Sequence, residues 1–518
     1  MTVLYTDADI SGGMIFQRDT DNPVTGGAEP LSEVRVRLVR DGKEVAAAAF
    51  AGEDGRFRVM LPALPGGFEA YTLEVSSGGE SLSFGDVLFG DVFHITGQST
   101  MELPIYRIYD PLDPSKPFSG EVRTPDCPYI REFRAPIVSC FDPDTDSDHW
   151  TRGEWFASDS PRAAEMSAVG YFFARRLFDS FGIPVGLVNT SAGGAAIEGF
   201  LPASELRALG GYDEFLDRVT VPGWQERTAR EDALRSEAWF KALSQGDGIA
   251  ERVLAGNYPE GEQTDLPWRI SGFSGRVWLW TEFTLPQDAP LEGAMLILGT
   301  LTDGDKCFIN GVPVGETGYM YPPRYYPVEA GVLKKGLNRL AVRLDICGGQ
   351  GGFTPGKRWC LKLSDGRLTD LSRGWHYAEA VSAEPLVPPA FFQGMPLALY
   401  GITFAPALHR NYKALVVYQG ESNCGNAGHY RELFTRFVDR YRSCCGYEIP
   451  VIFTQLPEYG TVEAWDEMRR AQQECTAIPR TAMAVTLGLG ELNDLHPINK
   501  WDVGHRLAAC AEQLICGE

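Results

Sequence analysis

The fold is decided by the stretch Asp91–Met101, which reads DVFHITGQSTM. β-Formers alternate from Val92 to Thr96 and lead directly into Gly97-Gln98-Ser99, which predicts a strand with a serine hydroxyl just beyond its carboxyl end. Open α/β sheets hold their ligands at that edge. Met101 stands where the G-x-S-x-G nucleophile elbow needs a small residue, so the stretch is not that elbow. Because a lone serine here is more often a helix cap, the rest of the chain must decide its role.

The composition is that of a globular chain of several domains. It has 518 residues, 44% hydrophobic and 22% charged, and its length predicts about three domains. A formal net charge of −22 argues against nucleic acid or an anionic membrane as a partner, although a small anionic substrate stays possible because local charge governs a pocket. No apolar run approaches the ~20 residues that a membrane span needs.

The amino terminus and the cysteines suggest a reducing compartment. The first residues, MTVLYTDADISGG, lack a basic region followed by an apolar core, so we expect a cytoplasmic protein; a secreted chain whose signal peptide had been removed would begin in the same way. Eleven cysteines without a C-x-x-C pair predict neither a zinc site nor a disulfide framework. Cys424 lies beside a polar motif, and we expect it to be a neighbour of the site rather than a nucleophile.

Changes in residue pattern divide the chain into four regions. Residues 1–90 alternate and are rich in turns, which predicts an N-terminal β-sandwich without a catalytic cluster. Residues 91–203 begin an α/β domain, and residues 391–518 complete it. Between them, residues 204–390 are first helical and charged and then rich in β-strands, with the tight-turn pair Asn310-Gly311. We expect this insertion to be a helical linker followed by a second β-sandwich.

A crossover follows the first strand. The pattern predicts an amphipathic helix that opens at Ser160-Pro161 and stops at Gly182, followed by a strand at Val185–Val188. The polar and glycine-rich run Asn189–Gly194 comes next. Strand, helix and strand form a parallel crossover, so the amides of that run can face the same crevice as Ser99.

The α/β alternation resumes near the carboxyl terminus. The expected elements are a strand at 414–418, a helix at 430–441, a strand at 451–456, a helix at 463–475 and a strand at 483–487. The last strand leads into Glu491–Pro497, and a helix then closes the chain. His496 in this loop can act as a base toward Ser99. Either Asp494 or Glu491 could orient His496, and the alternative role of Asp494 is to cap a helix that starts near Pro497.

Four motifs resemble those of one family. GQSTM, NTSAGG, YQGESN and NDLHPINKWDVGHRLA are similar, in the same order, to the motif blocks of the SGNH-type carbohydrate esterases, and within them of the sialate O-acetylesterase-like branch. The resemblance covers nearly the whole chain. It implies an α/β fold: a flavodoxin-like parallel sheet core with an N-terminal β-sandwich and an inserted jelly-roll β-domain of the galactose-binding type.

The resemblance also implies roles for individual residues. Ser99 would be the nucleophile, His496 its base and Asp494 the acid that orients the base. The oxyanion donors would be the Ser99 N–H, Gly194 and the Asn423 side chain, all uncharged groups that suit a tetrahedral oxyanion.

Some positions depart from the family or stay open. Whether Gly193 or Gly194 donates is not decided by the sequence. Thr100 stands where the family usually has asparagine. Many SGNH enzymes have Asp three residues before the histidine, whereas Asn493 occupies that place here.

The function implied by the resemblance is removal of O-acetyl groups from a sugar, first of all a sialic acid, through an acetyl-enzyme. A polysaccharide such as acetylated xylan would use the same residues, and an inactive carbohydrate-binding protein is the alternative from another class. No metal or cofactor is expected, the expected partner is an acetylated sugar, and the oligomeric state is left open.

Overall fold

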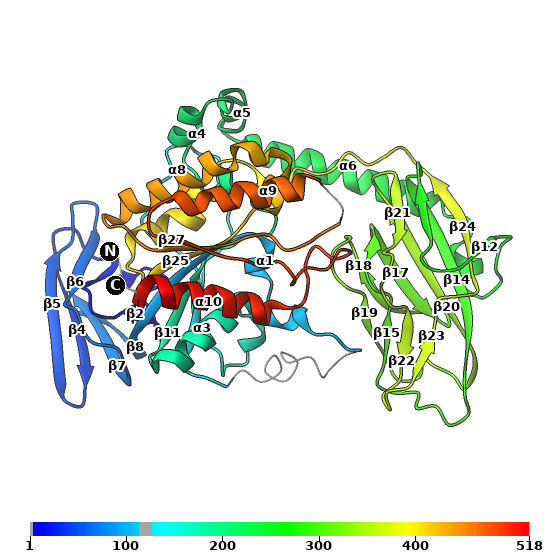
Figure 1. Cartoon of the computed structure of the whole chain (residues 1–518), viewed down its shortest axis with the longest axis horizontal. Helices are drawn as coiled ribbons and strands as arrows, with labels where there is room; N and C mark the ends of the chain where they lie inside the picture. Colours follow the sequence, from blue (N-terminus) through cyan, green and yellow to red (C-terminus); the bar gives the residue numbers. More distant parts are fainter. Residues whose placement is uncertain (1–3, 113–125, 461–462, 517–518) are drawn as a thin grey trace. The chain divides into compact units, whose positions relative to one another are not determined.

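The computed structural model describes residues 4–112, 126–460 and 463–516. The chain divides into two compact units (Figure 1). The first consists of Met1–Trp224 and Phe391–Glu518, and the second of Gln225–Ala390.

A mainly parallel sheet forms the centre of the first unit. The order of its strands is β10 (Glu154–Ala157), β9 (Ile130–Arg134), β11 (Val185–Asn189), β8 (Glu80–Gly97), β25 (Ala414–Tyr418), β26 (Val451–Thr454) and β27 (Thr481–Ala484). Only β10, at one edge, runs antiparallel to its neighbour. The chain leaves β8 toward β11 on one side and later returns to β25 on the other. The carboxyl end of β8 is therefore a topological switch point, where α/β sheets bind ligands.

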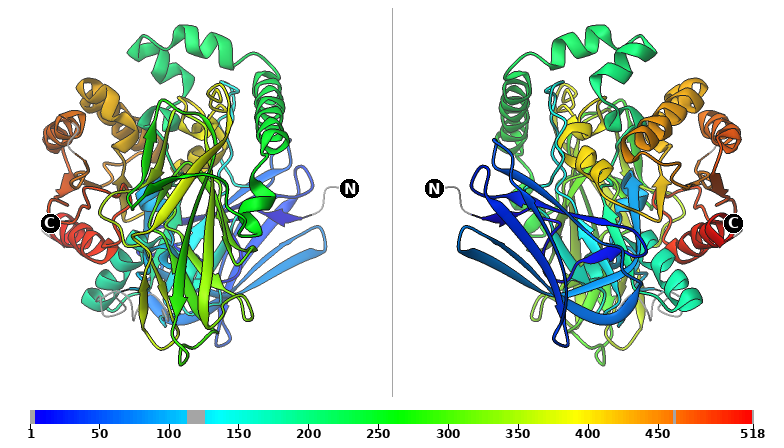
Figure 2. Two further views of the ribbon diagram at one scale, coloured as in Figure 1. Left: turned by 90° about the vertical axis from the view of Figure 1, so that its right-hand side faces the viewer. Right: turned by 90° about the vertical axis from the view of Figure 1, so that its left-hand side faces the viewer.

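Two pairs of helices cover the sheet. α3 (Ala168–Phe181) packs beside α10 (Lys500–Cys516) on one face, and α8 (Ala427–Cys445) packs beside α9 (Glu463–Glu474) on the other (Figures 1 and 2). Their apolar faces and the strands form one buried core. This three-layer arrangement confirms the predicted α/β class and the parallel crossover from β8 through α3 to β11.

The helix predicted from Ser160-Pro161 begins later. α3 starts at Ala168, because the Ser167 hydroxyl accepts a hydrogen bond from the Gly170 N–H at 2.9 Å and so caps the first turn. Gly182, with a φ of 60°, ends the helix at the predicted place. The Ser-Pro pair therefore marked a turn rather than the helix start.

The other expected elements differ from the structure mainly at their ends. β25 has the predicted bounds, whereas β26 and β27 are shorter or shifted by two or three residues. β9 and β10 lie between Met101 and Ser160, a passage in which the sequence pattern predicted no element. The remaining short helical segments of this unit are α1 (Ser99–Glu102), η1 (Ile105–Ile108), η2 (Ala163–Glu165), η3 (Ile197–Phe200), α4 (Ala203–Leu209), α5 (Asp213–Val219), η4 (Phe392–Gly394), η5 (Tyr400–Phe404), η6 (Ala405–His409), η7 (Glu421–Asn426) and η8 (Cys475–Ala477).

The amino-terminal strands join the central sheet instead of forming a separate unit. They are β1 (Tyr5–Thr6), β2 (Ile15–Gln17), β3 (Asn22–Gly27), β4 (Glu33–Arg40), β5 (Lys43–Phe50), β6 (Arg56–Leu61) and β7 (Gly67–Ser77). β1, β3 and β6 form one sheet, while β5, β4 and β7 continue into β8. A core that includes Val24, Val36 and Leu73 lies between these strands. The 18-residue strand β8 crosses the expected boundary at residue 90.

The second unit is rich in β-structure. Its helices are α6 (Trp224–Gly246) and α7 (Ala250–Leu254). A six-stranded sheet has the order β12 (Glu262–Thr264), β24 (Trp375–Ser382), β14 (Gly275–Leu285), β20 (Gly336–Ile346), β17 (Gly304–Ile309) and β18 (Val312–Thr317). A three-stranded sheet has the order β13 (Arg269–Ser271), β21 (Gln350–Phe353) and β16 (Leu301–Thr302). A four-stranded sheet has the order β19 (Tyr325–Val328), β15 (Ala294–Ile297), β22 (Cys360–Lys362) and β23 (Leu368–Asp370). The insertion was expected from residue 204, but residues 204–224 cluster with the first unit.

Within the described residues, ten cysteines carry free thiols, and no helix is both long and apolar enough to cross a membrane.

The turn before Ser99 depends on one glycine. Gly97 has a φ of +128°, a conformation that side chains disfavour. A methyl group added there would lie 2.0 Å from the carbonyl oxygen of Tyr418 in β25. Only glycine therefore allows β8 and β25 to stay paired up to the point where the serine emerges.

We expect Gly97→Ala to destabilise the first unit by about 2–5 kcal/mol, because the methyl group must displace the backbone of β25 and Ala must adopt an unfavourable φ. Gly85→Ala is the matched control, since a methyl group at this other glycine of β8 meets nothing within 4 Å. Urea unfolding of both variants measures the difference. Equal stability of the two variants would contradict the proposed constraint.

Candidate active site

Ser99 lies at the carboxyl edge of the central sheet. It is the first residue of α1 and follows β8 after the single residue Gln98. The first N–H groups of a helix have no partner within the helix. The half-buried Ser99 thus presents its hydroxyl and its backbone N–H at the switch point of the sheet.

The structure brings His496 to Ser99, as predicted. His496 Nε2 lies 2.8 Å from Ser99 Oγ, although 397 positions separate the two residues in sequence. His496 belongs to the loop between β27 and α10, which leaves the sheet at the same edge. At this distance a neutral imidazole can accept the serine proton.

The environment of His496 keeps the imidazole neutral. Burial lowers its pKa from the ordinary value of 6.5 to about 4, and the positive charges of Lys500 and Arg107 act in the same direction. The carboxylate of Asp494 opposes them. At neutral pH the ring is therefore unprotonated and ready to act as a base.

Asp494 contacts the backbone of its own loop rather than a helix end. Its Oδ1 accepts a hydrogen bond from the backbone N–H of His496 at 2.9 Å. α10 begins at Lys500, and Asn499 caps it by accepting from the Asp502 N–H at 3.2 Å. The alternative that Asp494 caps a helix near Pro497 is therefore wrong.

Glu491 is held elsewhere in the same loop. Its Oε1 accepts a long hydrogen bond, 3.5 Å, from the Ile498 N–H. The backbone of Glu491 pairs with that of Asp494. Of the two carboxylates, only that of Asp494 is among the charges that act on the pKa of His496. This favours Asp494 as the acid.

The glycine pair after β11 lies beside Ser99. A methyl group added at Gly193 would lie 3.8 Å from Ser99 Cβ and 2.9 Å from a carboxylate oxygen of Glu102. Burial raises the pKa of Glu102, and a hydrogen bond from the Gly193 N–H lowers it. Because Glu102 engages the Gly193 N–H, Gly194 is favoured as the oxyanion donor.

Asn423 links two loops. Its Oδ1 accepts from the Ile197 N–H at 3.0 Å and from Gln419 Nε2 at 2.6 Å, while its Nδ2 donates to Glu198 at 2.7 Å. The side chain is 3% exposed. One hydrogen of the Asn423 side-chain amide is donated to Glu198, so only the other hydrogen is left to donate to an oxyanion.

Two neighbours of Ser99 tie its turn to the loop after β25. The Gln98 Oε1 accepts from the N–H groups of Gly420 at 3.3 Å and Ser422 at 3.1 Å. Thr100 Oγ1 donates to Glu421 at 3.0 Å. Thr100 thus links the motif around Ser99 to the motif that contains Glu421.

A buried ionisable pair lies behind this turn. Lys500 is fully buried, and burial lowers its pKa to about 8, against the effect of Glu421. Burial raises the pKa of Glu421 to about 7, while Thr100 and Lys500 lower it. Each group partly compensates the charge of the other, which makes both tolerable in the core.

Cys424 is unsuited to nucleophilic attack. Burial raises the pKa of its thiol to about 12, so it carries no thiolate at neutral pH. Its Sγ lies 3.6 Å from the Gly420 carbonyl oxygen. It is a neighbour of the site, as expected.

Sequence reasoning missed several residues around the pair. Gln98, Glu102 and Glu421 stand within the quoted motifs, so their position next to key residues was a usable signal. Lys500 and Glu198 offered none, because a lone charged residue near a helix start usually faces solvent.

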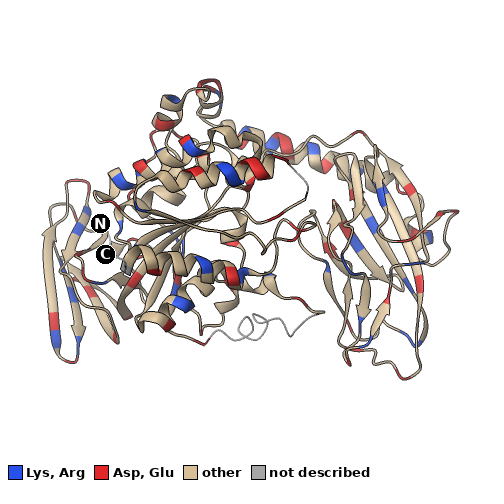
Figure 3. Cartoon of the chain, viewed as in Figure 1, with Lys and Arg blue, Asp and Glu red and all other residues tan. Residues whose placement is uncertain are grey.

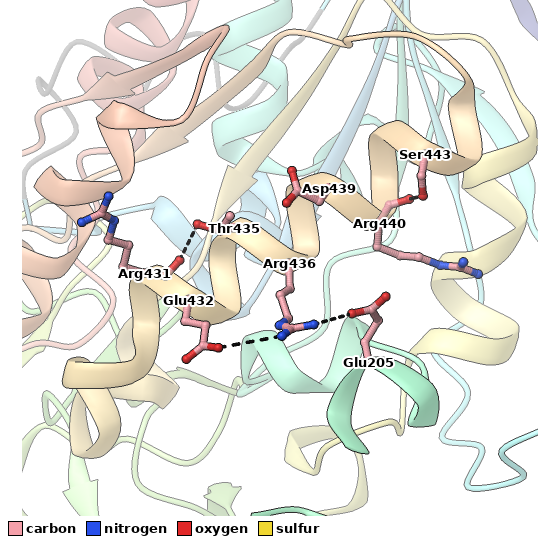
Figure 4. A pocket seen from close by; sticks show the side chains of 8 residues that line it. All are labelled: Glu205, Arg431, Glu432, Thr435, Arg436, Asp439, Arg440 and Ser443. Atoms are coloured by element: carbon pink, nitrogen blue, oxygen red, sulfur yellow. Dashed lines mark hydrogen bonds and ion pairs between the residues drawn. The ribbon is translucent and has the colours of Figure 1, made fainter. Parts of the chain in front are cut away.

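Another concave site carries no comparable chemistry. A pocket of about 670 Å³ lies over α8 and α4 (Figure 4). Its arginines already face acids: Arg436 pairs with Glu205 at 3.1 Å, and Arg440 with Asp146 at 3.2 Å. Nor does the described part of the chain contain a group of three or more His, Cys, Asp or Glu side chains placed to hold a metal ion.

Comparisons with known proteins relate the chain to carbohydrate esterases. A family model described as carbohydrate esterase, sialic acid-specific acetylesterase matches residues 402–512. The sialate O-acetylesterase of Rattus norvegicus is 28% identical over 225 residues, which cover 41% of this chain and 40% of the relative. That of Homo sapiens is 29% identical over 217 residues, with 39% of each chain covered. The chain thus spans about 40% of the length of the curated relatives it matches.

A carbohydrate acetylesterase from Xanthomonas citri has a similar structure. The match has a TM-score of 0.58 at 22% identity and covers 100% of this chain and 76% of that one. At this identity the likeness shows the fold. The chain is therefore similar in fold to a carbohydrate acetylesterase and, over part of its sequence, to sialate O-acetylesterases.

The electrostatics of the site predict the titration of His496. NMR of the imidazole nitrogens should give a pKa near 4. Lys500→Met should raise this pKa, because it removes a positive charge that disfavours the imidazolium, whereas Asp494→Asn should lower it further. Lys413→Met, just before the amino end of β25, is the control and should leave the titration unchanged. A pKa near 6.5 in the parent protein would contradict the buried geometry.

Proposed function

We propose that the protein is a serine esterase that removes O-acetyl groups from carbohydrate through an acetyl-enzyme, with an O-acetylated sialic acid as its substrate. The hydrogen bond between Ser99 Oγ and His496 Nε2, 2.8 Å long, is the observation that carries this proposal. It pairs a nucleophile with a neutral base in a chain whose four motifs follow the order of the family.

In the first half of the reaction, His496 Nε2 takes the Ser99 proton while Oγ forms a bond to the acetyl carbonyl carbon. The carbonyl oxygen becomes an oxyanion, stabilised by the N–H groups of Ser99 and Gly194. The bond from carbon to the sugar oxygen then breaks, and His496 gives its proton to the departing hydroxyl. The sugar leaves, and the acetyl group stays on Ser99.

In the second half, water replaces the sugar. His496 removes one proton as the water oxygen attacks the acetyl carbon, and the collapse of the second oxyanion returns the proton to Ser99 and frees acetate. Asp494 stabilises the imidazolium in both halves, because its carboxylate raises the pKa of His496. The step needs no redox change.

The choice of a sialic acid over a neutral sugar is supported by Arg107. This half-buried residue of η1 is close enough to lower the pKa of His496. Among the residues that the structure describes, its guanidinium makes no ion pair. The chain as a whole has a net charge of −22, and Figure 3 shows acidic and basic positions interspersed along the helices. A free cation near the base of an acidic protein suits a carboxylate on the substrate.

We further propose that both β-rich regions have the architecture that the family resemblance implies. Residues 4–90 would act as a β-sandwich that packs against the core, since their two sheets enclose a shared apolar cluster. The sheets of the second unit, around a cluster that includes Val277 and Leu344, would form a jelly roll of the galactose-binding type.

Ser99→Ala should lower kcat by about 10⁴-fold or more at an unchanged melting temperature, because the hydroxyl forms the covalent intermediate. Acetate release from O-acetylated sialic acids measures the activity. Cys424→Ser is the control and should stay active, since its thiol is protonated and lies outside the reaction. A Ser99→Ala variant that keeps most of its activity would refute the mechanism, and a wild-type protein that releases no acetate would favour an inactive binding protein.

Arg107→Gln should reduce the preference for an acetylated sialic acid over an acetylated xylo-oligosaccharide by about tenfold, the usual contribution of a charge-assisted hydrogen bond. The preference is the ratio of the two kcat/KM values, so an effect of Arg107 on His496 itself cancels. Arg107→Lys should keep part of the preference. If the parent protein prefers the xylo-oligosaccharide, the substrate is a neutral polysaccharide instead.

A further inference from the structure

An aromatic ring stands exposed at the edge of the proposed active site. Phe391, the residue before η4, is 54% exposed. Aromatic side chains are common in the lining of small-molecule sites, where they contact the apolar parts of a ligand. No motif in the sequence points to this residue.

The Phe391 ring lies against the glycine loop of the site. A methyl group added at Gly194 would lie 2.5 Å from Phe391 Cε1, and one added at Gly394 would lie 2.7 Å from Cδ1. Both positions must therefore lack a side chain for the ring to occupy its place. Gly194 is the favoured oxyanion donor, and its neighbour Gly193 borders Ser99, so the ring is close to the reacting ester.

The segment that carries the ring is held firmly. Gln393 Nε2 donates to the Gly193 carbonyl oxygen at 2.6 Å. The ring of Phe392 packs edge-on against Phe141 and Trp224, with ring centres 6.0 and 5.7 Å apart. Phe391 is thus a fixed surface, and binding a ligand to it costs little conformational entropy.

A pyranose ring matches this surface. One face of the ring presents C–H groups, whose hydrogens carry partial positive charge, and the face of a phenyl ring is negative. Every acetyl ester places the same acetyl group at Ser99, whereas the size and shape of the alcohol part differ from one ester to another. The alcohol part of the ester therefore determines whether Phe391 is covered.

We propose that Phe391 is a binding platform on which the sugar ring of the substrate stacks, so that the protein selects acetyl esters of pyranoses over acetyl esters of simple alcohols. This inference rests on the proposed esterase function. It assigns the selectivity for the ring to Phe391, and the selectivity for charge to a different residue, Arg107.

The test compares two esters with the same acetyl group, monoacetylated methyl β-xylopyranoside and ethyl acetate. For Phe391→Ala, the ratio of kcat/KM for the sugar ester to kcat/KM for ethyl acetate should fall roughly 3- to 10-fold, mainly through KM for the sugar ester. Phe391→Trp should keep the ratio. Phe181→Ala, which removes another exposed ring at the end of α3, is the matched control and should not change it.

An unchanged ratio in Phe391→Ala would overturn the platform, whether both rates fall together or neither does. Calorimetry in the Ser99→Ala background separates this failure from that of the proposed function, because it measures binding of the acetylated pyranoside without turnover. A parent protein that hydrolyses neither ester nor an O-acetylated sialic acid refutes the esterase function, while a 3- to 10-fold weaker affinity for the pyranoside after Phe391→Ala still supports the platform. Equal affinity with and without the ring refutes it.

Discussion

The backbones of β8 and β25 approach so closely at Gly97 that a methyl group there would lie 2.0 Å from the Tyr418 carbonyl oxygen. This contact keeps the two strands paired to their carboxyl ends, and both then turn away from the sheet at the same level. Ser99 and the loop after Tyr418 consequently emerge side by side. Had β8 ended a residue earlier, the serine would leave the sheet below the loops that surround it.

Polar side chains then join the loops that this contact aligns. Gln98 accepts from the backbone of the loop after β25, Ser422 Oγ donates to the Gly194 carbonyl oxygen at 3.0 Å, and Asn423 connects that loop to Glu198. The bond from Asn423 to Glu198 is buried, so the loss of either partner would leave a buried polar group unsatisfied. The site is therefore preorganised by its neighbours, and the reacting groups need little movement when a substrate arrives.

Much of this architecture was readable from the sequence. β8, β11 and β25 were predicted because buried parallel strands are short apolar runs, and Ser99 and His496 because motifs mark the ends of such strands. The start of α3 was wrong by several residues, since Ser160-Pro161 and Ser167 both offer a capping hydroxyl and only tertiary packing chooses between them. Asn423 shows a further limit. Its residue type suits an oxyanion donor, but the partner of its amide, Glu198, lies 225 positions away and carries no local signal.

The position of Phe391 was equally unreadable, since it depends on contact with two glycines, one of them far away in sequence.

The low basicity of His496 has a consequence for the chemistry. A base with a pKa of about 4 is always available at neutral pH, but the imidazolium that it forms in the reaction is costly in the same buried surroundings. Lys500 increases this cost, and Glu421 reduces it by compensating the lysine charge. In the proposed mechanism, a negative oxyanion forms beside the imidazolium and attracts it, so the ion pair of the transition state is stabilised in a place where the lone cation is not. In that mechanism, the buried surroundings lower the free energy of the transition state relative to a state in which only His496 is protonated. An interaction that is stronger in the transition state than in the ground state raises the rate rather than the affinity for the substrate.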